Sequence, residues 1–388
     1  MKKSTIITTL IVLVHTLVIA QTQRTTVFRS GEDGYLSYRI PAIISLNNGE
    51  LLAFCEGRKN GASDFGDNDI VMKRSTDRGR TWQKLQLVVD YTNLQASNSA
   101  PVLDTSDPKY PNGRIFLFYN TGNAHEYEVR SGKGLREAWY ITSTDMGKSW
   151  SQPVNITKEV HRPNQPRYHT EYRFPEDWRA YANTPGHALQ IKNGKYKGRI
   201  YVAANHSKGN PKNDYSDYQA HGYYTDDHGK SFKISKSVEF PGSNESTAAE
   251  LSSGKLILNS RNQKGDAKAR IVSTSNDGGE TWAETKINHQ LPDPVNQGSL
   301  LNLGKKNGKE ILAFCNAADT QQRNNLTLRI SLDEGKSWTK SWKIDHSDDP
   351  KIDFTAYSDL VKIGENKIGI LYERNNYQEI VFTTINWK

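Results

Sequence analysis

One eight-residue pattern occurs five times along this chain. It has the form Ser/Thr-x-Asp-x-Gly-x-x-Trp/Phe, and its copies occupy residues 75–82, 143–150, 225–232, 275–282 and 331–338. The Asp and Ser/Thr side chains can hydrogen-bond the backbone amides of a tight loop, and Gly allows a positive φ at its sharpest point. A short β-like run precedes each copy, so each copy is predicted to be a loop between two strands of a hairpin.

The spacing of the copies indicates the architecture. Successive copies start between 50 and 82 residues apart, which is too long for a solenoid coil and suits a four-stranded blade with long outer loops. The rest of the chain shows many short strands, Gly-rich turns and almost no helical periodicity. Nothing between Thr25 and Lys388 resembles a linker. Five marked repeats and one unmarked stretch predict an all-β, six-bladed β-propeller, in one domain over residues 21–388.

The first twenty residues have a different composition. Lys2 and Lys3 precede an apolar run that ends in Val18-Ile19-Ala20, the arrangement of a secretory signal peptide over residues 1–20. A transmembrane anchor is less favoured, because polar residues interrupt a segment already short for spanning. The mature protein is therefore expected to be exported, either periplasmic or secreted, without a membrane span.

Charge and cysteine content exclude several classes of site. The formal net charge of +8 becomes +6 without Lys2 and Lys3, and the basic residues form no stripe, so nucleic-acid binding is not expected. A mildly basic surface favours an anionic substrate. The two cysteines, Cys55 and Cys315, stand in similar runs and are predicted to be buried thiols on equivalent strands of two repeats. Neither they nor the histidines have the spacing of zinc ligands, so no metal or cofactor is predicted.

The segment 156–184 departs from the strand pattern. It is rich in Arg, Tyr and His and shows no period-2 alternation. We interpret it as a long inter-strand loop with its own packing. The alternative is an aromatic, basic rim beside a sugar site.

Three arginines stand at the ends of predicted strands. Arg39 precedes Ile40-Pro41, Arg261 ends a strand, and Arg323 lies just before another strand. Singly, each would most often be a surface ion-pair residue. If they converge at one mouth of a ring, their guanidinium groups could bind a substrate carboxylate through bidentate, charge-assisted hydrogen bonds.

Arg-Ile-Pro at 39–41, together with the five repeats, resembles the bacterial exo-sialidase (neuraminidase) family with Asp-box repeats, which is built on a six-bladed propeller. The match covers nearly all of the chain after residue 20. The resemblance implies an enzyme that removes terminal sialic acid from sialylated glycoconjugates with retention and without a metal.

The resemblance also implies roles for individual residues. Arg39, Arg261 and Arg323 resemble the family's arginine triad, with Arg329 as a rival for the third place. Asp64 matches the acid/base aspartate, although Asp67 and Asp69 stand nearby. Tyr357 is similar to the nucleophilic tyrosine, and Glu245 to its glutamate partner, with Glu250 as the rival. Glu373 resembles the glutamate that braces the first arginine, and Gln297 resembles a residue of a loop that faces the site.

These assignments agree with the chemistry of the sugar. Sialic acid carries a carboxylate on its anomeric carbon, so a carboxylate nucleophile would meet like-charge repulsion, whereas a phenol is neutral until it attacks. The reference pKa of a phenol is about 10, so Tyr357 needs a base such as Glu245. Asp64 would protonate the departing oxygen and then activate water.

Two other functions remain open at this point. An intramolecular trans-sialidase would use the same residues with a different aglycone pocket. A sialic-acid-binding propeller without turnover would need only the arginines, and the presence of Asp64, Tyr357 and Glu245 argues against it.

Overall fold

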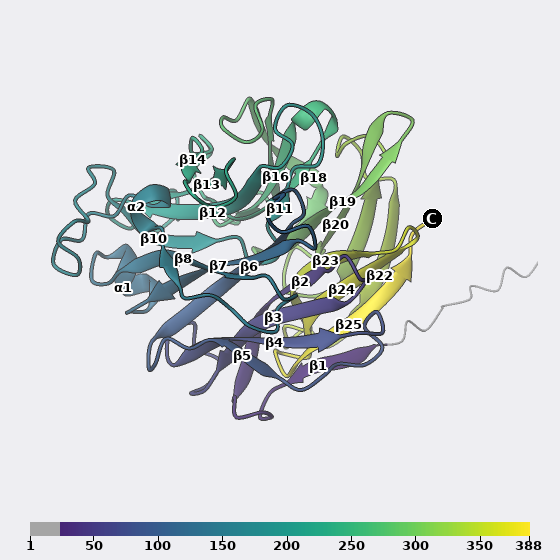
Figure 1. Ribbon diagram of the computed structural model, residues 1–388, viewed down its shortest axis with the longest axis horizontal. Helices are drawn as coiled ribbons and strands as arrows, with labels where there is room; N and C mark the ends of the chain where they lie inside the picture. Colours follow the sequence, from purple (N-terminus) through teal and green to yellow (C-terminus); the bar gives the residue numbers. More distant parts are fainter. Residues whose placement is uncertain (1–23) are drawn as a thin grey trace, which may run out of the picture.

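The computed structural model describes residues 24–388 (Figure 1). The predicted signal peptide, residues 1–20, lies outside the described residues. The described chain is almost entirely β, with twenty-five strands and only short helices: α1 (Glu126–Arg130), α2 (Thr157–Val160) and the 3-10 turn Ser252–Gly254. None of the helices within residues 24–388 is long and apolar enough to cross a membrane.

The strands form six antiparallel blades in chain order. Blade 1 contains β2 (Ser37–Ser45), β3 (Leu51–Arg58), β4 (Asn68–Ser75) and β5 (Gln86–Val89), and blade 2 contains β6 (Gln95–Asp104), β7 (Arg114–Gly122), β8 (Arg136–Ser143) and β9 (Val154–Asn155). Blade 3 contains β10 (Trp178–Asn183), β12 (Ile200–Lys208), β13 (Tyr218–Thr225) and β14 (Lys233–Ile234), with β11 (Leu189–Gln190) paired to β12. Blade 4 contains β15 (Ser243–Glu250), β16 (Leu256–Asn262), β17 (Ala269–Ser275) and β18 (Glu284–Pro292). Blade 5 contains β19 (Gly298–Lys306), β20 (Lys309–Ala317), β21 (Leu326–Ser331) and β22 (Lys340–Asp345), and blade 6 contains β23 (Thr355–Ile363), β24 (Lys367–Arg374), β25 (Glu379–Asn386) and β1 (Thr25–Arg29).

Two of these blades share one continuous sheet. Blades 1 and 2 are joined by a single parallel pair, Asn68 with Gln95, and all other pairings within them are antiparallel. Blade 6 takes its outer strand from the start of the described chain, because β1 pairs with β25. Figure 1 shows β1 in purple beside β25 in yellow. The ring is thus closed by both ends of the chain, and the predicted six-bladed propeller is confirmed.

Each repeat motif is the loop between the third and fourth strands of its blade, as predicted. In the first copy, the Gly79 N–H donates to Ser75 Oγ at 2.8 Å, and Thr81 donates from its N–H and its hydroxyl to the Asp77 carboxylate. The hydrogen bonds from Thr81 lower the pKa of Asp77 to about 2. Gly79 has a φ of 87°, which a residue with a Cβ adopts only with strain. Trp82 then packs edge-on against Phe382 of blade 6, so the loop also joins neighbouring blades.

The apolar core lies between adjacent blades. One buried cluster joins Val27, Phe28 and Phe382 of blade 6 to Ile43 and Cys55 of blade 1. Cys55 and Cys315 are both buried free thiols on the second strands of their blades, as predicted.

The segment 156–184 is only partly a loop. It contains α2 and an isolated bridge between Asn164 and Arg173, and it then continues into β10, which pairs with β12. The register of that pairing shifts between Trp178 and Tyr181. This irregularity disrupts the period-2 pattern, which is why the strand was not visible in the sequence.

Candidate active site

The innermost strands of four blades carry irregularities at one mouth of the ring. The pairing register shifts between Arg39 and Ala42 in β2, between Ser97 and Ala100 in β6, between Ser243 and Ser246 in β15, and between Thr355 and Ser358 in β23. A β-bulge bends its strand and redirects a side chain that regular pairing would hold in the sheet. Arg39, Asn98, Glu245 and Tyr357 lie at these four irregularities, and all of them line one cavity of about 350 Å³. Asp64, Arg261 and Arg323 line the same cavity.

Arg39 is held by a buried carboxylate from blade 6. Its Nε lies 2.8 Å from Glu373 Oε1, and the same carboxylate accepts hydrogen bonds from the backbone N–H groups of Ile40 and Tyr357. Burial alone would lower the pKa of the Arg39 guanidinium, but the charge of Glu373 outweighs it and raises that pKa. Ile40 has a φ of 60°, which is costly for a β-branched residue. Glu373 therefore stabilises a strained backbone and fixes the direction of Arg39.

Substitution of Glu373 by Gln is expected to lower the free energy of unfolding by about 3–5 kcal/mol, because it leaves the buried guanidinium of Arg39 without its counter-charge. Urea unfolding measures this loss. The exposed Glu365→Gln variant is the control and is expected to change stability by less than about 0.5 kcal/mol. A Glu373→Gln protein as stable as the control would contradict the role given to this carboxylate.

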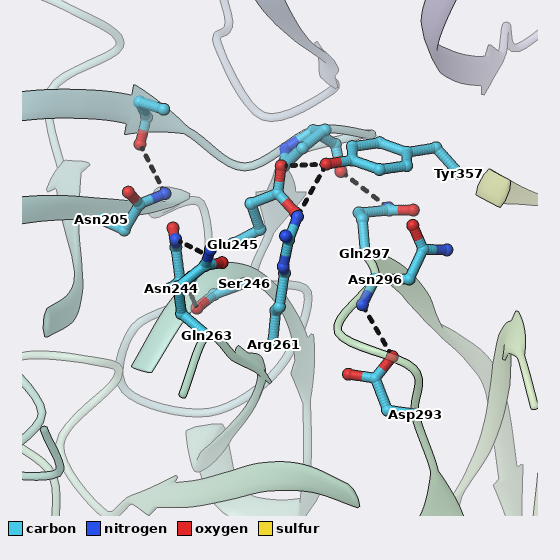
Figure 2. Close-up of polar contacts among 12 residues, drawn as sticks. Asn205, Asn244, Glu245, Ser246, Arg261, Gln263, Asp293, Asn296, Gln297 and Tyr357 are labelled. Atoms are coloured by element: carbon cyan, nitrogen blue, oxygen red, sulfur yellow. Dashed lines mark hydrogen bonds and ion pairs between the residues drawn. The ribbon is translucent and has the colours of Figure 1, made fainter. Parts of the chain in front are cut away.

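The hydroxyl of Tyr357 lies between a carboxylate and a guanidinium. It donates to Glu245 Oε1 at 2.6 Å and accepts from Arg261 Nη1 at 3.0 Å, while the same Nη1 contacts Glu245 Oε2 at 2.8 Å. Figure 2 shows the Glu245 and Arg261 side chains converging on the end of the tyrosine ring. Register explains the grouping, because Arg261 lies opposite the irregularity that presents Glu245. A phenol, its proton acceptor and a cation thus form one hydrogen-bonded unit.

The phenol of Tyr357 is neutral in this setting. Burial and the charge of Glu245 raise its pKa, against the opposing effect of Arg261 and Arg323. The hydroxyl therefore keeps its proton in the free protein, and Glu245 is the carboxylate placed to accept it.

Arg323 approaches the same ring from blade 5. Its guanidinium carbon lies 5.5 Å from the centre of the Tyr357 ring, and its Nη1 donates to Tyr377 Oη at 3.1 Å. The Tyr377 ring also lies under Arg39, at 4.1 Å, so one tyrosine contacts two of the three arginines. The rival Arg329 points elsewhere, because its Nη1 donates to Asn316 and it is absent from the cavity lining.

Asp64 is the aspartate that faces the cavity. It lies on the loop between β3 and β4, its side chain is 63% exposed, and its Oδ1 accepts from Arg58 Nη1 at 2.9 Å. Partial desolvation by the surrounding loops would raise its pKa, but the charges of Arg58 and Arg39 outweigh that effect and hold the pKa below its ordinary value. The rivals Asp67 and Asp69 both bind Lys59 and are not part of the lining.

Gln297 is not brought into the cavity lining. Its amide donates to the carbonyl oxygens of Pro185 and Ser358 and accepts from the Ser358 N–H, all at 3.0 Å. It therefore supports the backbone next to Tyr357, and Figure 2 shows it beside the tyrosine rather than among the groups at its hydroxyl. The rival Glu250 accepts from the backbone of Lys192 and Asn193, outside the cavity as well.

Several residues of the cavity were not identified from the sequence. They are Glu56, Arg58, Gln95, Asn98, His125, Glu126, Tyr127, Arg130, Arg136, Asn205, Tyr215, Tyr218, Asn244 and Gln263. Tyr181, also in the lining, belongs to the segment 156–184, for which a rim beside a sugar site is the alternative interpretation. Arg58 had a visible signal, since it ends the strand that follows Arg39 and has Glu56 two residues before it. The two residues pair at 2.6 Å.

Comparison with known proteins places the chain. Residues 49–370 match the family described as the BNR repeat-like domain. The chain is 31% identical over 370 residues to a sialidase of Micromonospora viridifaciens, covering 89% of this chain and 51% of that protein. It is 28% identical to a sialidase of Bacteroides fragilis, covering 89% of this chain and 61% of that protein. The chain thus spans about half to three fifths of the length of these relatives.

Solved structures agree with this placement. The structure of the Hadza microbial sialidase Hz136 has a TM-score of 0.77 and 26% identity, covering 94% of this chain and 68% of that one. The resemblance to sialidases inferred from Arg39-Ile40-Pro41 and the repeats is thereby confirmed. The chain belongs to the BNR repeat-like domain family.

Proposed function

We propose that this protein is an exo-α-sialidase that hydrolyses terminal sialic acid from glycoconjugates. One observation carries the proposal: three arginines from blades 1, 4 and 5 surround a phenol whose hydroxyl donates to Glu245 at 2.6 Å. Guanidinium groups bind carboxylates through paired, charge-assisted hydrogen bonds. Sialic acid differs from most sugars in carrying a carboxylate on its anomeric carbon. A site that binds this carboxylate also brings that carbon to the phenol.

The first chemical step transfers the sugar to the protein. Tyr357 Oη attacks the anomeric carbon while its proton passes to Glu245 Oε1, and the bond to the glycosidic oxygen breaks. Asp64 donates a proton to that oxygen, so the aglycone leaves as an alcohol. The substrate carboxylate offsets the charge of Arg39, one of the charges that lower the Asp64 pKa in the free protein, and so favours the protonated acid. The neutral phenol avoids the repulsion that a carboxylate nucleophile would meet, and Arg261 stabilises negative charge on Oη.

The second step releases the sugar. The Asp64 carboxylate takes a proton from a water molecule, and the oxygen of this water attacks the anomeric carbon. The bond to Tyr357 Oη then breaks, and Glu245 returns its proton to the phenolate. Two displacements at one carbon restore the original configuration, so the product retains the α-anomer.

Asp64→Ala is expected to reduce kcat/KM for sialyllactose by about 10²–10⁴-fold, and to reduce it far less for 4-nitrophenyl sialoside. The alkoxide of lactose needs a proton to leave, whereas nitrophenolate leaves without one. Because kcat/KM covers only the steps up to aglycone departure, the ratio of the two losses isolates the acid role. Equal losses on both substrates would remove Asp64 from that role.

Product analysis tests the function itself. We expect the protein to hydrolyse a fluorogenic sialoside, with the α-anomer of free sialic acid as the first product by NMR. Formation of an anhydro sugar would assign an intramolecular trans-sialidase instead, and binding without turnover would assign a lectin. Parallel reactions with α2,3-, α2,6- and α2,8-linked substrates define the linkage preference.

We also propose that the protein is exported. The charged and apolar residues 1–20 support this. A mature protein that starts at Gln21 when isolated from the periplasm or medium is the expected result. An unprocessed cytoplasmic chain would contradict it.

A further inference from the structure

A row of three residues crosses blade 2 at the cavity. Gln95 of β6 pairs with Gly122 of β7, and Gly122 pairs with Arg136 of β8. Residues paired in this way project on the same face of a sheet. Gln95 and Arg136 both line the cavity, so their side chains flank the position of Gly122. The arginines assigned to the substrate carboxylate come from other blades.

Both flanking side chains have buried polar atoms without partners. Gln95 is 3% exposed and Arg136 is 4% exposed. Within residues 24–388, neither Gln95 Oε1 nor Arg136 Nε has a hydrogen-bond partner. Buried polar groups without partners are rare because each costs free energy. An arginine that lines a cavity and has no hydrogen-bond partner in the protein indicates that the bound ligand supplies the partner.

Arg136 differs in this respect from the other cations of the cavity. Arg39, Arg58, Arg130 and Arg261 each form an ion pair with a carboxylate, and Arg323 donates to Tyr377. For Arg136, no such contact with another described residue is found. Its hydrogen-bonding capacity is therefore available to a ligand.

Gly122 lets the side chains of Gln95 and Arg136 lie close to the sheet, because it has no side chain of its own. A Cβ at this position would lie 2.9 Å from Gln95 Oε1 and 3.3 Å from Arg136 Nε. Glycine is needed at this position because it lacks a Cβ, and not because of its backbone conformation, since its φ lies outside the left-handed region. The Gln95 amide and the Arg136 guanidinium therefore lie close together over Gly122, and both border the cavity.

We propose that the side chains of Gln95 and Arg136 together recognise one hydroxyl group of the bound sugar, which accepts a hydrogen bond from Arg136 and donates one to Gln95. A hydroxyl both donates and accepts, so it satisfies both side chains. A methyl group would leave both unpaired, and a carboxylate would face the Gln95 oxygen without a proton. The proposal rests on the proposed function, because it assigns a specificity-determining subsite to the same cavity.

A sialic acid can supply this hydroxyl from three positions. The acyl arm carries one in the N-glycolyl sugar and none in the N-acetyl sugar. The others are the ring hydroxyl at C4 and the hydroxyls of the glycerol tail. We therefore test three matched pairs of aryl sialosides: N-glycolyl with N-acetyl, intact with 4-deoxy, and intact with a tail shortened by periodate.

The measured quantity is the ratio of kcat/KM within each pair. In the wild-type protein, one pair is expected to favour the hydroxylated sugar by at least about 10-fold. Arg136→Met and Gln95→Leu should each bring that ratio close to one and leave the other two ratios unchanged. Gly122→Ala should have the same effect, since its Cβ would displace both side chains without removing either polar group. Arg179→Met is the matched control, because Arg179 pairs with Asp177 outside the cavity lining, and it should keep all three ratios.

These measurements separate the proposed sialidase activity from the hydroxyl subsite. A wild-type protein that cleaves none of these sialosides defeats the proposed function. A wild-type protein that cleaves them, with all three ratios within about twofold of wild type in Arg136→Met, Gln95→Leu and Gly122→Ala, defeats the hydroxyl subsite alone. A collapse of one ratio in these variants, and not in the control, establishes the subsite and identifies the hydroxyl.

Discussion

Tyr357→Phe is expected to reduce kcat for a fluorogenic sialoside by at least about 10³-fold, while the protein still binds sialic acid. The substitution removes one oxygen, which is the atom that we assign as the nucleophile. Loss of a nucleophile that acts with its base costs at least this much in other hydrolases. Binding should persist, because the three arginines and Glu373 remain. Steady-state turnover and calorimetric titration with sialic acid measure the two quantities.

The matched control for this substitution is Tyr377→Phe. It removes a hydroxyl that contacts Arg323, in the same cluster of arginines but away from the reacting atom. We expect a higher KM and a kcat within about tenfold of wild type, since the Tyr377 hydroxyl bonds Arg323 and the Asp353 carboxylate and so positions an arginine rather than the reacting atom. Full activity of Tyr357→Phe would remove Tyr357 from its role. An equal loss of kcat in both variants would show that the two tyrosine hydroxyls only maintain the structure of the site.

The second large effect is an expected loss of stability in mild acid. His161, His206 and His221 are buried together against Trp178 and Tyr181, and His206 Nδ1 lies 3.1 Å from His221 Nδ1. Burial lowers the pKa of all three, to about 3 for His221 and well below the ordinary value for the other two. The nearby cations Arg162 and Lys208 act in the same direction.

The direction of the effect follows from proton uptake. Below pH 6.5 the unfolded chain binds protons at these histidines and the folded chain does not, so acid favours unfolding. Full stability is present above pH 6.5 and is lost as the pH falls toward the folded pKa values. Each histidine contributes roughly 1.4 kcal/mol per pH unit, so unfolding should cost roughly 4 kcal/mol less at pH 5.5 than at pH 7.5. His187 affects stability in the opposite sense. The charge of Asp359 outweighs burial and raises its pKa, so the stability that His187 contributes is lost as the pH rises above 6.5.

Urea unfolding between pH 7.5 and 5.5 tests this expectation. His221→Phe should reduce the slope of stability against pH by about one third, since one of three titrating groups is removed. His289→Phe is the control, because His289 is exposed, and it should keep the full slope. A stability independent of pH over this range would show that the cluster is hydrated and titrates normally.

The predictions from sequence succeeded where the pattern is local. The five loops, their glycines and the equivalent positions of Cys55 and Cys315 depend on neighbours in the chain, and all were identified. Arg39 and Glu373 stand at opposite ends of the chain, in the first and last blades, and only the resemblance to a family suggested that they pair. Gln297 follows a loop like those that face the site, yet its amide bonds the backbone of Ser358. Whether the Gln297 side chain faces the cavity or the neighbouring backbone depends on tertiary packing, which no local sequence pattern encodes.

Other parts of the site have no sequence signal for a physical reason. Gln95, Gly122 and Arg136 belong to three strands, and only the register of β6, β7 and β8 brings them side by side. Tyr377 meets Arg39 and Arg323 because blade 6 closes between blades 5 and 1. A β-bulge at Glu245 or Tyr357 likewise depends on its partner strand.

The closure of blade 6 by β1 has a consequence for how activity arises during biosynthesis. Asp64 and Arg39 are synthesised early, whereas Tyr357 and Glu373 follow the strands of the first five blades in the chain. The proposed nucleophile and the carboxylate that holds Arg39 are thus delivered by the same late segment that completes the ring. A chain that ends before blade 6 would contain the proposed acid without the proposed nucleophile, so the proposed activity would arise only when the last blade folds.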